Sequence, residues 1–178
     1  MPANDRKLTM DELGRMAPET YASAPRRPVV VLLDDVRSRH NVGSIFRTAD
    51  SFGIERIVLC GFTPQPPHRE IEKTALGATL SVPWSHSPTC VEAVAELQRQ
   101  GYRVLAVEQT AQAEPIDRLA GNAADRLALV FGNELEGVSD AVVRQVDGCV
   151  VIPQHGSKHS MNVSVCAGVV LWWVAGRH

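Results

Sequence analysis

The chain has 178 residues, of which 44% are hydrophobic and 21% are charged, and its formal net charge is −2. This composition is typical of one ordinary globular domain and excludes a disordered or fibrous protein. The slightly negative charge also excludes a protein that coats nucleic acid by bulk electrostatics. Residues 1–47 nevertheless carry eight Lys and Arg against six Asp and Glu, while residues 101–150 carry four against eight. Any surface for nucleic acid should therefore be local.

Cysteine usage and hydropathy exclude further classes of protein. The sequence contains four widely spaced cysteines, Cys60, Cys90, Cys149 and Cys166. Because they form no CxxC pair, they predict neither a zinc site nor a redox motif, and we expect reduced thiols in a cytoplasmic protein. Residues 1–15 lack the apolar run of a secretory signal peptide. Residues 163–175 are apolar but shorter than the roughly 20 residues that span a bilayer, so they predict a buried helix and no membrane association.

The first 27 residues predict a short N-terminal appendage, and residues 28–178 predict one domain in which apolar runs alternate with helical segments. Strands are predicted at residues 29–33, 56–59, 102–107, 127–131 and 149–152, and helices at 42–52, 89–100, 140–146 and 161–175. The strand runs are apolar at every position, which is typical of a parallel sheet covered on both faces. The fold class is therefore α/β.

Glycines and prolines mark the ends of these elements. Gly53, Gly101 and Gly176 stand just past three predicted helices, where a residue in the left-handed conformation is favoured. Residues 61–70 contain three prolines, so they predict a long surface loop and neither a helix nor a central strand.

The segment after the first strand is the first candidate site, because open α/β sheets usually bind ligands at the carboxyl ends of their strands. Residues 34–47 read D-D-V-R-S-R-H-N-V-G-S-I-F-R. They contain neither a GxGxxG nor a P-loop pattern, which argues against a dinucleotide or nucleoside triphosphate site. Asn41 could simply be a helix N-cap. Arg47 lies on a largely apolar predicted helix, so its guanidinium should bind either a carboxylate of this chain or a phosphate.

Two later segments also follow strands. Residues 132–139, G-N-E-L-E-G-V-S, predict a tight turn where a ligand can approach the backbone, which by itself is a weak signal. Residues 152–164, I-P-Q-H-G-S-K-H-S-M-N-V-S, lead from a strand into the last apolar helix. Buried Ser160, Asn162 and Ser164 would need hydrogen-bond partners there, which a ligand could supply.

Other chemistries find little support in the same segments. His155 and His159 are four residues apart, but Gly156 between them disfavours the helical spacing of a metal site. We therefore expect no metal. The GxSxG pattern of a serine hydrolase is absent from the sequence.

Three segments of the chain together resemble motifs 1, 2 and 3 of the SpoU (TrmH-like) branch of the SPOUT RNA methyltransferases. They read N-V-G-S-I-F-R-T-A-D-S-F-G, F-G-N-E-L-E-G-V-S and I-P-Q-H-G-S-K-H-S-M-N-V-S-V, in the order and spacing of that family, and the resemblance covers about residues 29–175. It implies a parallel-sheet SPOUT fold with a deep C-terminal trefoil knot. It also implies transfer of a methyl group from S-adenosylmethionine to a ribose 2′-hydroxyl of tRNA or rRNA. Larger relatives carry an RNA-binding domain before the catalytic one. Because this chain has only the short appendage, the resemblance does not indicate how the RNA substrate is selected.

The resemblance also implies roles for individual residues. S-adenosylmethionine would be held around Gly132, Glu134, Ile152, Ser160 and Met161. The catalytic polar set would be Asn41, Arg47, Glu134, Ser160 and Asn162. Because the sulfonium charge disappears during transfer, a carboxylate against the sulfur would stabilise the wrong state, so Glu134 should orient the backbone or Arg47. Since an arginine loses its proton only at high cost, we expect Arg47 to clamp a phosphate, with water or phosphate taking the proton.

The expected partners are a structured RNA and a second copy of the chain. The predicted RNA contacts are Arg37, Arg39, His40, His68, Arg69 and Lys73. Residues 169–174 are apolar all around their helix, which predicts burial in a homodimer, and relatives pair through this region. One alternative is a non-catalytic RNA-binding or assembly protein that keeps the fold. Another is a small-molecule methyltransferase, which the basic residues disfavour.

Overall fold

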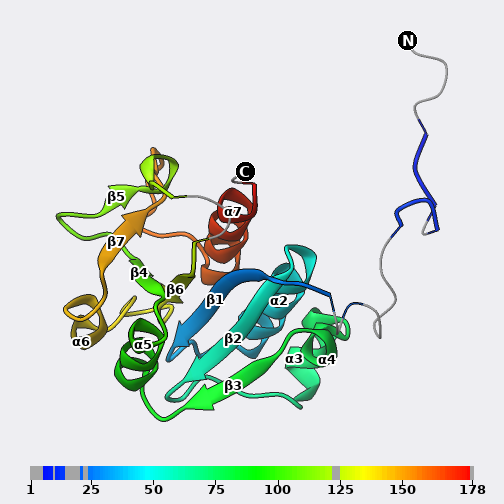
Figure 1. The fold of residues 1–178 in the computed structure, drawn as a ribbon, viewed down its shortest axis with the longest axis horizontal. Helices are drawn as coiled ribbons and strands as arrows, with labels where there is room; N and C mark the ends of the chain where they lie inside the picture. Colours follow the sequence, from blue (N-terminus) through cyan, green and yellow to red (C-terminus); the bar gives the residue numbers. More distant parts are fainter. Residues whose placement is uncertain (1–5, 10, 15–20, 22–23, 122–124, 177–178) are drawn as a thin grey trace.

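The computed structural model describes residues 6–9, 11–14, 21, 24–121 and 125–176. Within them a seven-stranded sheet forms the centre of the domain (Figure 1). Its strands are β1 (Arg27–Asp34), β2 (Ile54–Cys60), β3 (Trp84–Ser87), β4 (Arg103–Val107), β5 (Glu114–Pro115), β6 (Leu127–Phe131) and β7 (Gly148–Val151). The spatial order is β3-β2-β1-β6-β4-β7-β5, and every neighbouring pair is parallel. The predicted parallel α/β class is confirmed.

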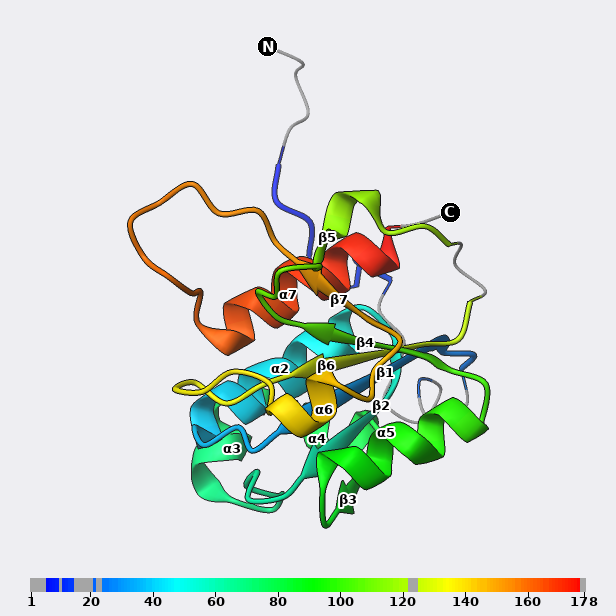
Figure 2. The same ribbon diagram turned by 90° about the vertical axis from the view of Figure 1, so that its left-hand side faces the viewer.

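Helices cover both faces of the sheet, as Figure 2 shows for α7 and α5. The helices are α2 (Arg39–Ser51), α3 (Arg69–Ala75), α4 (Ala78–Ser81), α5 (Cys90–Arg99), α6 (Asp140–Val143) and α7 (Val163–Ala175), with a short 3₁₀ turn at Ile116–Arg118. One hydrophobic cluster joins α2, α3, α4 and α7 to the sheet, and a second joins α5 and α6 to the opposite face. In β1, Val31 and Leu33 enter the first cluster and Val30 and Leu32 the second. This double burial explains why the strand runs are apolar at every position.

Helix ends differ from the predictions where side chains cap them. The first predicted helix begins at Arg39, three residues early, because Ser38 is its N-cap and accepts a hydrogen bond from the Asn41 N–H at 3.3 Å. Asn41 is therefore inside the first turn, and its reading as an N-cap was wrong. The last helix begins at Val163, capped by Asn162, two residues later than predicted.

Other boundaries also need correction. The predicted loop ends at His68, because the Nδ1 of His68 accepts from the Glu70 N–H and starts α3. The short strands β3 and β5 were not predicted, and α6 ends at Val143, three residues early. Gly53 and Gly101 have positive φ angles as expected, whereas Gly176 has φ −80° and is not left-handed.

All four cysteines lie in the described part of the chain and are free thiols; Cys60 and Cys90 are buried, and the other two are half-buried. A hydrogen bond with Cys60, together with burial, raises the pKa of the Cys90 thiol. Among the described residues, no helix combines the length and apolar character needed to cross a membrane.

Candidate functional site

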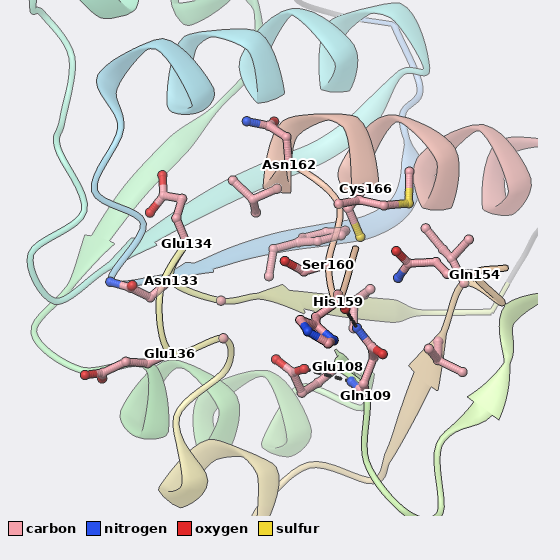
Figure 3. A pocket seen from close by; sticks show the side chains of 18 of the residues that line it. Glu108, Gln109, Asn133, Glu134, Glu136, Gln154, His159, Ser160, Asn162 and Cys166 are labelled. Carbon is pink, nitrogen blue, oxygen red and sulfur yellow. Dashed lines mark hydrogen bonds between the residues drawn. The ribbon is translucent and has the colours of Figure 1, made fainter. Parts of the chain in front are cut away.

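A cavity of about 510 Å³ opens where β4, β6 and β7 end (Figure 3). Because all the strands are parallel, the loops that follow them meet at this edge of the sheet. The lining comes from residues 107–109, 131–137, 150–152, 154, 159–163 and 166. A cavity of several hundred Å³ accepts a ligand of nucleoside size.

The 132–138 loop, which follows β6, forms one wall of this cavity and is closed on itself. The N–H groups of Asn133 and Gly137 each donate to the other residue's carbonyl at 2.9 Å. The Oε2 of Glu108, at the end of β4, accepts from the Val138 N–H at 2.9 Å. The Asn133 side chain donates to the Asp35 carbonyl at 2.8 Å. Neighbouring segments thus hold this wall in place through both backbone and side chains.

Glu134 connects the 132–138 loop to the start of α2. Its carboxylate accepts from the Arg37 N–H at 2.9 Å, the Ser38 N–H at 3.0 Å and the Asn41 side-chain amide at 3.0 Å. Partial burial, the largest single effect, raises the pKa of Glu134, but these three donors together outweigh it and leave the pKa below its usual value. Glu134 therefore orients the backbone of residues 37 and 38, and no contact with Arg47 is present.

The 153–162 loop, which follows β7, forms the opposite wall and is largely exposed. The Gln109 side chain donates to the His159 carbonyl at 2.5 Å. At its end, the Oδ1 of Asn162 accepts from the Ser164 N–H at 2.9 Å and the Val165 N–H at 3.4 Å, which caps α7. The Asn162 amide also donates to the Oδ1 of Asn41 at 3.2 Å.

The expectation that Ser160, Asn162 and Ser164 are buried was wrong. Ser160 and Asn162 are exposed, and Ser164 is half-buried with its hydroxyl donating to Asn162 at 2.7 Å. The helix begins right after Asn162, so Ser160 and Asn162 lie in the loop and Ser164 lies in the first turn of α7, outside the core. The partner of the Ser164 N–H and hydroxyl is the capping Asn162 side chain.

The structure places most of the predicted site residues around one cavity. The residues predicted to hold the cofactor all line it: Gly132, Glu134, Ile152, Ser160 and Met161. Asn162 lines it too, and Asn41 adjoins it through Glu134 and Asn162. Arg47 is different: it is exposed on α2 outside the lining, and it forms no ion pair with any residue that the structure describes.

Sequence reasoning missed Glu108 and Gln109, which line the cavity directly after β4. The signal that revealed the other segments, polar residues right after an apolar strand, was present here as well. Cys166 on α7 also lines the cavity, and burial, with the negative charge of Glu108, raises the pKa of its thiol to about 11. That thiol stays protonated at neutral pH.

The predicted RNA contacts lie at the start of α2 and along α3, and these two helices pack against each other. Arg37, His40, Arg69 and Lys73 are exposed, and Arg39 is 3.6 Å from Glu70 in an exposed ion pair. His68 is half-buried as the cap of α3. No group of three or more potential metal ligands occurs in the part of the chain that the structure describes.

Within one copy of the chain the last helix is buried on one side only, and burial of its other side in a homodimer stays a prediction. Val170, Leu171 and Val174 are buried, whereas Val165 is 53% and Trp172 is 62% exposed. Val169, 37% exposed, lies between these two along the same side of α7. An apolar stripe thus remains uncovered within this chain.

Comparison with known sequences relates the chain to one family. The model of the SpoU rRNA Methylase family matches residues 28–172. The 23S rRNA (guanosine-2′-O-)-methyltransferase RlmB of Neisseria meningitidis is 31% identical over 144 residues, which are 81% of this chain and 56% of that protein. The protein of the same name from Xanthomonas axonopodis is 32% identical over 152 residues, 84% of this chain and 59% of that protein. The chain therefore spans less than two thirds of the length of these relatives.

Solved structures show the same fold. The A. aeolicus TrmH/SpoU tRNA modifying enzyme is 25% identical with a TM-score of 0.78, over 89% of this chain and 79% of that one. The AdoMet-bound rRNA methyltransferase from Sinorhizobium meliloti is 28% identical with a TM-score of 0.77, over 90% of this chain and 60% of that one.

Proposed function

The chain belongs to the SpoU rRNA Methylase family, and on this premise we propose that it transfers the methyl group of S-adenosylmethionine to a ribose 2′-hydroxyl of a tRNA or rRNA. One observation carries the proposal beyond the family match. Asn41, Glu134 and Asn162, from three segments far apart in the sequence, are joined by hydrogen bonds at the mouth of one nucleoside-sized cavity. The similar RlmB proteins are named as guanosine-2′-O-methyltransferases of 23S rRNA.

The cavity's residues fit the cofactor. Val107, Ile152 and Met161 offer apolar surface for an adenine ring, while Gln154 and backbone groups offer polar contacts. When bound, S-adenosylmethionine would supply an electrophilic methyl group on its sulfonium. The carboxylate of Glu134 is already engaged by three donors, which keeps it in a positioning role, and this suits a reaction in which the sulfonium charge is lost.

The substrate hydroxyl must lie in line with the methyl group, and correct positioning alone can lower the activation barrier by several kcal/mol. We assign Arg47 to a clamp on the neighbouring phosphate, because its guanidinium is exposed on α2 and has no ion-pair partner among the described residues. The hydroxyl proton then passes to phosphate or water. The basic residues at the starts of α2 and α3 would hold the RNA on the same side.

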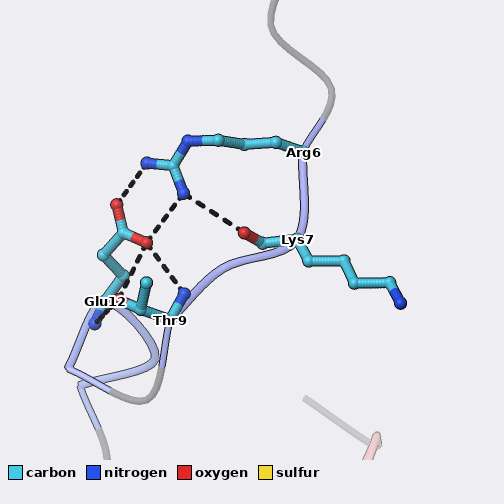
Figure 4. Close-up of polar contacts among 4 residues, drawn as sticks. All are labelled: Arg6, Lys7, Thr9 and Glu12. Carbon is cyan, nitrogen blue, oxygen red and sulfur yellow. Dashed lines mark hydrogen bonds and ion pairs between the residues drawn. The ribbon is translucent and has the colours of Figure 1, made fainter.

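We also retain residues 28–178 as the methyltransferase domain, with the C-terminal trefoil knot of the family, and residues 1–27 as a short N-terminal appendage in a cytoplasmic protein. Early in this appendage, Arg6, Lys7, Thr9 and Glu12 make polar contacts with one another (Figure 4). Glu12 accepts from the Thr9 N–H at 2.8 Å and pairs with Arg6. The Arg6 guanidinium, with help from Thr9, lowers the pKa of Glu12 to about 2. Farther along the appendage, the Tyr21 hydroxyl donates to the Asp50 carbonyl at 2.8 Å and Arg26 donates to the Ser81 carbonyl at 2.6 Å, which ties its end to the domain.

A homodimer is part of the proposal. The stripe of Val165, Val169 and Trp172 would be covered by a second copy, because contiguous exposed apolar surface on a soluble protein marks an interaction site. Light scattering should give twice the monomer mass at micromolar concentration. A stable monomer would contradict this part alone.

Methyl transfer is tested with the purified chain, tritiated S-adenosylmethionine and total RNA from cells that lack the gene. We expect label in a nucleotide that resists alkaline cleavage on its 3′ side, as a 2′-O-methylated ribose does. Calorimetric titration with S-adenosylmethionine alone provides the control. Cofactor binding without transfer to any cellular RNA, or no cofactor binding at all, would instead favour a non-catalytic RNA-binding or assembly protein.

A further inference from the structure

Phe62 is an aromatic side chain that is exposed to solvent. It lies in the loop of residues 61–68, between β2 and α3, and it is 92% exposed. Burying a phenylalanine is worth roughly 1.5–3 kcal/mol. A ligand that covers the exposed ring would therefore gain binding energy from it.

The backbone around Phe62 is fixed, so the ring does not simply hang from a loose loop. The Phe62 N–H donates to the Oδ1 of Asp35 at 2.6 Å. The next residue, Thr63, is buried, and its hydroxyl donates to the Leu33 carbonyl at 2.9 Å and accepts from the Val36 N–H at 3.1 Å. The loop is thus anchored to the end of β1, and it presents Phe62 outward.

The same hydrogen bonds connect Phe62 to the cavity. Asp35 binds the Phe62 N–H through its side chain, and its own carbonyl accepts from the side chain of Asn133, which lines the cavity. Phe62 is therefore two hydrogen bonds from the cavity wall. The loop of Phe62 and the cavity thus lie at the same end of the parallel strands.

The charges around the ring favour a polyanion. Three acidic side chains on this side are held within the chain: Asp35 accepts from the Phe62 N–H, Glu134 accepts from three donors, and Glu70 pairs with Arg39. The exposed Arg37, two residues after Asp35, and the exposed Arg69, directly after the loop of Phe62, form no ion pair with any residue that the structure describes. An exposed ring amid free cations suits an unpaired nucleotide, whose base stacks while its phosphate pairs with the cations.

We propose that Phe62 is a stacking platform for an unpaired base of the RNA, next to the nucleotide that enters the cavity. The proposal rests on the proposed function for the identity of the partner. Single-stranded RNA should consequently bind better than a duplex of the same sequence, since only unpaired bases expose a face to the ring.

The test compares Phe62→Ala with Phe62→Tyr, which keeps a ring, and with Leu80→Ala as the matched control. Leu80 is also 92% exposed, but it lies on α4, which leads into the amino end of β3. Because β2 and β3 are parallel, Leu80 is at the opposite edge of the sheet from Phe62. The probe is a fluorescein-labelled RNA of about 12 nucleotides that forms no secondary structure, measured by anisotropy at one fixed salt concentration.

We expect Phe62→Ala to weaken binding of the single strand on the order of 10-fold, as loss of one stacked base does. Phe62→Tyr and Leu80→Ala should bind like the unchanged chain, and all variants should bind S-adenosylmethionine alike. Equal RNA affinity of Phe62→Ala and the unchanged chain overturns the proposal, as does a failure of the unchanged chain to bind the single strand. An altered dimer mass in Phe62→Ala with unaltered RNA affinity would assign the ring to a protein contact instead. Methyl transfer by the unchanged chain is scored separately, so the proposed function can stand when the stacking proposal fails.

Discussion

The two walls of the cavity are built in different ways. The 132–138 loop is closed by its own backbone hydrogen bonds and tied to β4, to Asp35 and to the start of α2. The 153–162 loop is exposed from Pro153 to Ser160, and the hydrogen bonds described for it are the one from Gln109 and, at its end, the Asn162 cap of α7 and the bond from Asn162 to Asn41. The 132–138 loop is thus preformed before a ligand binds, whereas few hydrogen bonds hold the 153–162 loop in one conformation.

This contrast suggests how binding energy is distributed. A preformed wall costs no conformational entropy on binding, while ordering an exposed loop does. We therefore expect the 132–138 loop to set where the ligand lies and the 153–162 loop to close over it. Substitutions in the two walls, and at Arg47 outside them, test this division, from the largest expected effect to the smallest.

Glycines in the two walls give a direct comparison. A Cβ on Gly132 would lie 2.0 Å from the Gly137 carbonyl carbon, whereas a Cβ on Gly156 would meet nothing within 4 Å. We expect Gly132→Ala to cost about 1–3 kcal/mol of stability, as overpacking does, and to remove measurable cofactor binding. Gly156→Ala should stay within about 0.5 kcal/mol of the unchanged chain. Thermal unfolding and calorimetric titration measure both, and similar losses in the two variants would erase the distinction between the walls.

Arg47 lies in neither wall, so its replacement should separate chemistry from cofactor binding. Arg47→Ala should lower the single-turnover methylation rate on the order of 10²-fold while leaving fold and cofactor affinity nearly intact. Arg47→Lys should restore little, because an ammonium lacks the planar two-point geometry for phosphate. A fully active lysine variant would reject the clamp, and an unchanged alanine rate would remove Arg47 from catalysis.

Asn162 belongs to the exposed wall but also caps α7. From the sequence, its alanine variant should weaken cofactor binding more than folding. The observed cap adds a folding cost of about 1 kcal/mol. Asn162→Ser keeps a cap acceptor while losing the donor to Asn41, so it should fold like the unchanged chain and still bind cofactor less well. Normal affinity in the serine variant would limit Asn162 to capping.

Glu134 holds the preformed wall against α2, and the lowered pKa makes its effect depend on pH. A carboxyl whose pKa is lower in the folded than in the unfolded state stabilises the fold at pH values above its usual pKa of 4.5. This stabilisation is lost as the pH falls through the lower pKa of the folded state. Glu134→Gln should therefore melt slightly earlier at pH 7, and the two melting curves should converge in acid. A difference that persists at low pH would mean that shape, and not charge, holds this contact.

Sequence patterns located the sheet and most of the cavity, because strand burial and the polar segments that follow strands are local signals. The β6 prediction, Leu127–Phe131, matches the observed strand at both ends. Patterns failed where one long-range side-chain bond decides the geometry. Ser38 and Asn41 are both good caps, and only the contacts of Asn41 with Glu134 and Asn162 explain why Ser38 takes the cap. Likewise, nothing near Glu108 in the sequence indicates its bond to Val138, 30 residues away.

The side chain of Asn41 has one donor group and one acceptor, and the two face different partners. Its nitrogen meets a carboxylate and its oxygen meets an amide, so an aspartate here would set acid against acid and a leucine would leave both partners unmatched. Residues 41, 134 and 162 are therefore expected to change together in evolution. Among related sequences, replacements of Asn41 should occur together with replacements at positions 134 or 162, and such correlated change would be visible in any sufficiently deep set of homologues.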